Sequence, residues 1–216
     1  MTTKSTTIIS IALIAIAMIA GAVLWNQLPD QMASHWNVND QVDGTMSKFW
    51  GVLLMPLITL GMFVLFLIIP GIDPLKANIA KFRESFNLFI VLIIVFMLYI
   101  HGLTLAWSLG YQDFKMSTAM LPFMGVLFIA IGFMLRKAKR NFFIGIRTPW
   151  TLSSDSVWHK THQLGSVLFM ASGVFAIIGG VFGGMIAFWL MFVPLIGSSV
   201  FLVIYSYALY RGETKA

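Results

Sequence analysis

Long apolar stretches without charged side chains dominate the pattern of hydrophobic and polar positions along the chain. They are Ser5–Leu28, Phe49–Ile72, Ser85–Gln112, Met116–Leu135 and Thr161–Tyr210. About 20 apolar residues suffice for a helix to cross the hydrocarbon core of a bilayer, so each of the first four predicts one membrane span. The fifth is about twice too long for one span and contains two glycine pairs, Gly179-Gly180 and Gly183-Gly184, which interrupt helices. We therefore expect two spans there, Leu164–Phe182 and Met185–Tyr210, joined by a tight turn. The fold class is an all-α polytopic membrane protein with six transmembrane helices.

Basic residues fall almost entirely on one side of these spans. Of the 14 lysines and arginines, only Lys48 and Lys115 lie in the segments of the opposite side. The positive-inside rule then predicts cytoplasmic N- and C-termini. The expected organisation is residues 1–72 with two spans and an outer loop at 29–48, residues 73–135 with two spans, residues 136–210 with an inner segment and two spans, and a cytoplasmic tail at 211–216.

Composition excludes several classes of protein. With 59% hydrophobic and 10% charged residues, the chain lacks the polar surface of a soluble enzyme or a nucleic-acid-binding domain. The absence of cysteine excludes disulfides, thiolate zinc sites and thiol nucleophiles. The net charge of +6 is explained by basic loops, so we expect membrane lipids as partners, no direct nucleic acid, and a multi-pass location in the cell membrane.

The spans hold little ionisable chemistry. They contain no Asp, Glu, Lys or Arg, and His101 is the titratable side chain well within one. Coupled transporters and proton pumps need such groups at membrane depth. We expect His101 to be hydrogen-bonded within the bundle. Pro56, Pro122 and Pro194 leave open a transporter with interrupted helices.

The outer segment, residues 29–48, is the first place where function is expected. Pro29 is predicted to end the first helix and Asp43-Gly44 to form a turn. The alternating polar and apolar residues between them favour a short hairpin or a segment lying on the membrane surface. This segment is either a docking surface for an extracellular partner or a packed lid over the bundle, and its candidate contacts are Asp30, His35, Trp36 and Asp43. Its carboxylates and His35 are irregularly spaced for a metal site, and we expect neither metal nor cofactor.

The inner segment, residues 136–161, is the second such place. It opens with a basic cluster, Arg136, Lys137, Lys139 and Arg140, which is expected to contact lipid headgroups or a protein partner. Gly145 permits a tight bend and Pro149 pre-sets a turn. N-cap candidates at 153–156 then predict a short interfacial helix before the fifth span. Trp158 and His162 are four residues apart and share one helix face.

Two motifs make the chain resemble a known family. Residues 141–165, N-F-F-I-G-I-R-T-P-W-T-L-S-S-D-S-V-W-H-K-T-H-Q-L-G, resemble the signature of the SdpI family of bacterial membrane proteins. The outer segment L-P-D-Q-M-A-S-H-W-N…V-D-G-T-M-S-K resembles the short domain of unknown function that often precedes it. Met32-Ala33 replaces the usual Ile-Pro, and Gln163 stands where Arg is common.

The resemblance implies an immunity and signalling protein of bacterial or archaeal origin. One member of the family protects a toxin-producing Bacillus from its own secreted peptide toxin and also sequesters a cytoplasmic transcriptional repressor at the membrane. The same is therefore expected here, with a toxin outside and a repressor inside, and without enzymatic activity. The signature positions carried over from the family are Asn141, Gly145, Arg147, Thr148, Pro149, Trp150, Trp158, Thr161 and His162.

The role of the signature segment stays open among three hypotheses. Arg147 and the nearby lysines could bind lipid phosphates. Trp150 and Trp158 could anchor a protein partner, since Trp and Arg dominate interface hot spots. As scaffold, Arg147 and His162 would bond carbonyls at the ends of adjacent helices. For the whole protein, the alternatives are a small transporter of a toxic peptide or lipid and a lipid-acting membrane enzyme, the latter disfavoured because no nucleophile–base pair is evident.

Overall fold

The computed structural model describes residues 1–214 and is built almost entirely of long helices. Within these residues, six helices are long and apolar enough to cross a membrane. They are α1 (Thr3–Leu24), α2 (Lys48–Ile72), α4 (Arg83–Ser108), α5 (Met116–Lys137), α7 (Asp155–Phe182) and α8 (Gly184–Glu213). The remaining elements are the 3-10 turn η1 (Trp25–Gln27), the strands β1 (Gln31–Trp36) and β2 (Val42–Ser47), and the short helices α3 (Lys76–Ala80) and α6 (Pro149–Ser153). The predicted all-α, multi-pass membrane protein is confirmed.

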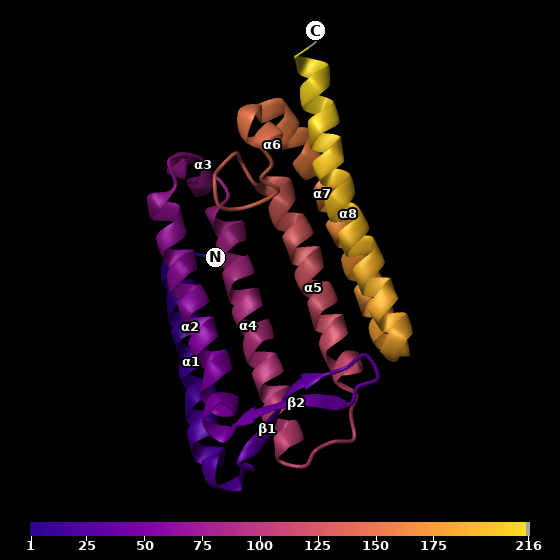
Figure 1. Cartoon of the computed structure of the whole chain (residues 1–216). Helices are drawn as coiled ribbons and strands as arrows, with labels where there is room; N and C mark the ends of the chain where they lie inside the picture. The colour runs from indigo at the N-terminus through magenta and orange to yellow at the C-terminus, as the bar shows by residue number, and fades with distance from the viewer. Residues whose placement is uncertain (215–216) are drawn as a thin grey trace.

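The helices form two groups that meet along α4 and α5 (Figure 1). One group is α1, α2 and α4, and the other is α5, α7 and α8, with α5 and α7 in the most extensive contact of any pair. Glycines bring α5 and α7 together, because a Cβ on Gly173 would lie 2.5 Å from the carbonyl oxygen of Gly125. The first two-thirds of α4 also packs a buried aromatic core against its neighbours, including Phe63, Phe82 and Phe86.

The predicted division of the last apolar stretch is confirmed. Helix α7 ends at Phe182 and α8 begins at Gly184, and Gly183 between them has a φ of +71°. Only glycine adopts this left-handed region without steric cost. The helices continue through Pro56 and Pro70 in α2, Pro122 in α5 and Pro194 in α8. The interrupted helices that a transporter would use are therefore not present among the described spans.

The outer segment folds as a two-stranded antiparallel hairpin in which Gln31 pairs with Ser47 and Trp36 with Val42. The predicted turn at Asp43-Gly44 is wrong, because the chain reverses at residues 37–41. There the Asn37 side chain accepts hydrogen bonds from the backbone of Asn39 and Gln41, and Asp40 has a φ of 60°. Gly44 instead lies within β2, opposite an irregularity at His35. The first span continues from α1 through η1 to Gln27, and Leu28, directly before Pro29, is extended, as a following proline favours.

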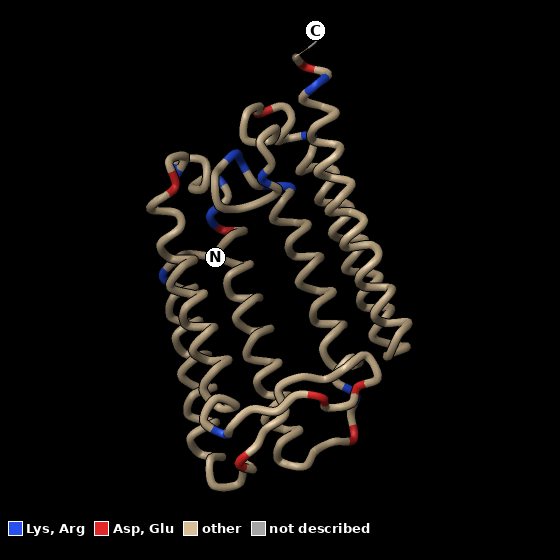
Figure 2. The backbone as a smooth tube through the Cα atoms, viewed as in Figure 1, with Lys and Arg blue, Asp and Glu red and all other residues tan. Residues whose placement is uncertain are grey.

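Charge is distributed unequally between the two ends of the helices (Figure 2). Within the described residues, Lys48 and Lys115 lie near the hairpin, and the other lysines and arginines gather toward the end that carries α3 and α6. We call these two ends the hairpin end and the basic end. The hairpin contacts α2 and α4, and the Asp40 carboxylate accepts hydrogen bonds from the backbone N–H and the hydroxyl of Ser117 at the start of α5. The hairpin thus joins both helix groups.

Candidate functional site

The signature loop, residues 138–148, bends at the basic end of the molecule and is organised around Asn141. This side chain is fully buried. Its amide group donates to the carbonyls of Lys139 and Ile144, and its carbonyl oxygen accepts from the backbone N–H groups of Phe143 and Ile144. Four hydrogen bonds from one amide replace the regular secondary structure that the loop lacks, which satisfies backbone groups that would otherwise be unpaired.

His162 fastens the next part of the loop to α7. Its Nε2 accepts a hydrogen bond of 3.0 Å from the backbone N–H of Ile146, and its Nδ1 lies 2.8 Å from the carbonyl oxygen of Trp158. Since a carbonyl can only accept, Nδ1 carries the proton and the imidazole is neutral. The ring stacks on Trp158 at a centroid distance of 3.9 Å. Trp158 and His162 therefore share one face of α7, as predicted. His162 hydrogen-bonds to the loop and to its own helix, and not to the end of an adjacent helix.

Gly145 has a backbone conformation that only glycine tolerates at this point. Its φ is +113°, and a Cβ added there would lie 2.5 Å from His162 Nε2. The glycine of the signature therefore allows the loop to approach the histidine closely.

Trp158 is buried inside the protein. Its side chain is 3% exposed, and its indole N–H donates to the carbonyl of Ala138 at 3.0 Å. The hypothesis that Trp158 anchors a protein partner is wrong, because the ring is enclosed between the loop and His162. Trp150, by contrast, is half-buried against Tyr207 of α8.

The threonines of the signature begin α6. Thr148 and Thr151 form a reciprocal capping box, with Pro149 in the first helical turn. The Thr148 hydroxyl also lies 3.0 Å from that of Ser206 in α8, so this corner is tied to the last span. Thr161 is fully buried, and its hydroxyl has no hydrogen-bond partner among residues 1–214.

Two residues that sequence reasoning missed hold the loop against the other helix group. Asp73, 2% exposed at the end of α2, accepts hydrogen bonds from the backbone N–H groups of Leu75 and Phe142. Asn78 of α3 donates to the carbonyl of Arg140. A single Asp or Asn after a span carries no signal of such a contact, because the partners are more than 60 residues away.

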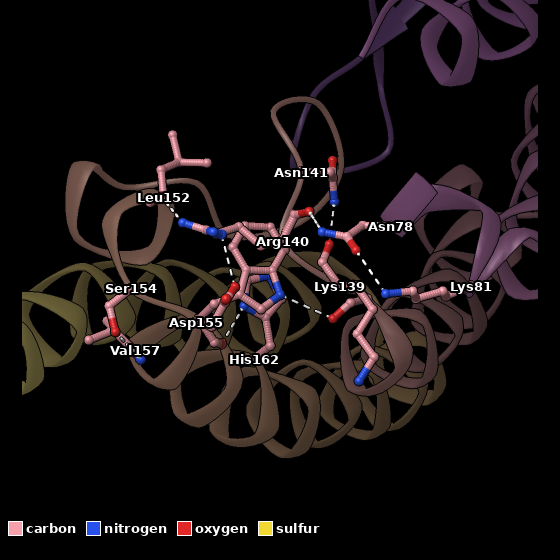
Figure 3. A network of polar contacts seen from close by, with 12 residues as sticks. Asn78, Lys81, Lys139, Arg140, Asn141, Leu152, Ser154, Asp155, Val157 and His162 are labelled. Atoms are coloured by element: carbon pink, nitrogen blue, oxygen red, sulfur yellow. Dashed lines mark hydrogen bonds and ion pairs between the residues drawn. The ribbon is translucent and has the colours of Figure 1, made fainter. Parts of the chain in front are cut away.

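The basic cluster divides into fixed and free side chains (Figure 3). Arg140 forms an ion pair of 2.8 Å with Asp155 and donates to the carbonyl of Leu152, so it acts within the fold. Arg136, Lys137 and Lys139 are exposed, and none of them is paired with a carboxylate within residues 1–214. Arg147 is also exposed and donates to the carbonyl of Phe142.

At the hairpin end, the predicted contact residues differ in accessibility. His35 and Asp43 touch each other across the strands, with 70% and 45% of their side chains exposed. Asp30 pairs with Lys48 at 3.2 Å. Trp36 packs edge-on against Trp107 of α4, with ring centroids 5.8 Å apart. Asp30, His35 and Asp43 are therefore the exposed members of the predicted set, whereas Trp36 is half-buried.

The acidic and histidine side chains of the two ends do not gather into a cluster of three in the part of the chain that the structure describes. Within residues 1–214, no three His, Cys, Asp or Glu side chains lie close enough to hold a metal ion. His101 is 1% exposed, and neither ring nitrogen has a hydrogen-bond partner among those residues. The expectation that the bundle hydrogen-bonds His101 is therefore not met.

Comparison with known proteins agrees with the two motifs. Residues 137–206 match the model of the SdpI/YfhL protein family, and residues 12–60 match a domain of unknown function, DUF1648. The chain is 26% identical over 204 residues to the immunity protein SdpI of Bacillus subtilis (strain 168), covering 94% of this chain and 95% of that protein. No solved structure matches. The resemblance is thereby confirmed: this multi-pass membrane protein is similar to the SdpI/YfhL family in its last third and to DUF1648 in its first span, hairpin and the start of its second span.

Proposed function

We propose that this protein makes the cell that carries it immune to a secreted peptide toxin, which it meets at the hairpin end. The observation that carries the proposal is that a body of six long helices holds a folded, exposed surface at each end. The relative that matches along nearly the whole chain is named an immunity protein. The proposal places the hairpin outside the cell, where a secreted toxin arrives first, and the basic end in the cytoplasm, in accord with the positive-inside rule.

The basic end is proposed to capture a repressor protein. Lys139 and Arg147 of the signature loop are exposed, and the half-buried Trp150 follows Arg147 by three residues. Arg and Trp are the residue types that contribute most at protein interfaces. Their charge favours a partner with an acidic surface. Asn141, Gly145, Trp158 and His162 support this surface from within the fold and are not proposed to touch the partner.

Replacement of SdpI in Bacillus subtilis by this chain tests the proposal. The strain is grown beside wild-type cells that produce the toxin, and survival is measured together with a repressor-controlled reporter, both normalised to protein amount. We expect survival with the unmodified chain. The double substitution H35A/D43A should lower the tolerated toxin dose about tenfold, the effect of losing about 1.4 kcal/mol of binding. T45A, also exposed in β2, is the matched control.

The two surfaces should be separable. K139E should change the reporter while leaving survival intact, and H35A/D43A should do the reverse. If each variant loses both outputs in proportion to its abundance, the residues are scaffold and the assignment is wrong. Replacing His101 by leucine addresses ion-coupled transport: survival that persists in H101L supports immunity by binding, and its loss at normal abundance favours a transporter.

A further inference from the structure

A groove follows the seam between α4 and α5 on the surface that faces the membrane. Its volume is about 350 Å³. Apolar side chains line it from Leu88 to Leu92 on α4 and from Val126 to Phe133 on α5. Leu88, Val126 and Phe133 are 51%, 46% and 56% exposed, so the groove is open to its surroundings. Because its walls are membrane spans, those surroundings are lipid acyl chains.

The length of the groove corresponds to one leaflet of a bilayer. It extends along α5 from Val126 to Lys137, which is about 16 Å at the helical rise of ~1.5 Å per residue. The hydrocarbon core is about 30 Å thick, so half of it is about 15 Å. A single acyl chain of one leaflet therefore matches the groove in both length and polarity.

Polar groups occur at one end of the groove only. Ser85 and Lys137 line it at the basic end of the molecule, where the spans reach the membrane surface. Lys137 is exposed and has no carboxylate partner within residues 1–214. Glu84 precedes Ser85 but does not line the groove. The charge at this end therefore favours an anionic headgroup.

We propose that the groove binds an anionic phospholipid, with one acyl chain between α4 and α5 and its phosphate at the Lys137 ammonium group. The site lies close to the signature loop. Phe89 and Met134 line both the groove and a second cavity of about 260 Å³, whose wall includes Phe143–Ile146 of the loop. The lipid would thus contact, from the membrane side, two side chains that also line the cavity beside the loop.

Binding of two lipids with identical acyl chains to the purified chain in detergent tests this site. Native mass spectrometry compares dioleoyl phosphatidylglycerol, which is anionic, with dioleoyl phosphatidylcholine, which is zwitterionic. We expect the wild type to prefer the anionic lipid about fivefold, the value of one basic contact near a headgroup. K137Q should reduce this preference to about one, whereas R136Q, which alters a neighbouring exposed residue outside the groove, should retain it.

A second variant tests the acyl-chain position independently of charge. A130F places a ring within the groove and should reduce the binding of both lipids. V174F adds the same ring to an exposed position on α7 and should leave both unchanged. Equal binding of the two lipids by the wild type, equal losses in K137Q and R136Q, or unchanged binding in A130F at a normal unfolding temperature would each overturn the proposal.

Discussion

His162 serves two backbone segments at once, since its ring accepts from Ile146 of the loop and donates to Trp158 of α7. The pairing of Trp158 with His162 could be predicted, because residues four apart share a helix face. The contact of His162 with the loop could not. It depends on Gly145, whose positive φ lets the loop backbone approach the ring closely. No local sequence pattern specifies which helix the loop will contact.

Replacing His162 by phenylalanine should destabilise the protein. A phenyl ring can keep the stacking on Trp158 but leaves the Ile146 N–H without an acceptor, which costs about 1–3 kcal/mol for a buried donor. Thermal unfolding of the purified variant in detergent measures the loss. H159F is the control, because His159 is exposed on the same helix. Equal unfolding temperatures for the two variants would contradict this role of His162.

At the scale of the elements, the sequence predicts five of the six membrane helices to within a few residues, because charged residues and glycines mark where apolar stretches end. The exception is α7, which begins at Asp155 and not at the predicted Leu164, because the helix that starts at the caps of residues 153–156 continues without a break into the span. The hairpin was less predictable. Its turn at residues 37–41 depends on the Asn37 side chain and on the left-handed Asp40, while the more typical turn pair Asp43-Gly44 is used inside a strand. Helix partners were not predictable either, since these spans are apolar around most of their circumference.

The α5–α7 pair should be sensitive to a side chain at its closest point. In G173L, the new Cβ would lie 2.5 Å from the Gly125 carbonyl oxygen and 2.7 Å from the Ile129 side chain. The helices must then separate, and overpacking of this kind costs about 1–3 kcal/mol or more. We expect a lower unfolding temperature and a smaller folded yield. G61L is the matched control, because a Cβ at Gly61 meets nothing within 4 Å, and similar losses in both variants would exclude a specific contact.

At the scale of the whole molecule, the unequal charge of the two ends predicts the orientation in the membrane. The chain has no cysteine of its own, so single cysteines report position without background. Cysteines at Thr45 and Ser47 of the hairpin, both exposed, should react with an impermeant thiol reagent in intact cells. A cysteine at Ser153, exposed at the basic end, should react only after lysis. The reverse pattern would place the hairpin in the cytoplasm.

The two helix groups are also two consecutive halves of the chain, joined by residues 109–115. Among residues 1–214, four side chains of the first half make the side-chain hydrogen bonds between these halves. Asp40 and Asp73 accept, and Asn78 and Tyr99 donate. Their partners in the second half are backbone groups of Ser117, Phe142, Arg140 and Ala119. The Ser117 hydroxyl is the one side-chain partner there. The hydrogen bonds of this joint therefore depend mainly on side chains of the first half, whereas side chains of both halves contribute to its apolar packing. At Ala119, Arg140 and Phe142, a substitution in the second half leaves the hydrogen bond across the joint in place as long as the backbone keeps the same course, whereas a substitution at Asp73, Asn78 or Tyr99 in the first half removes it.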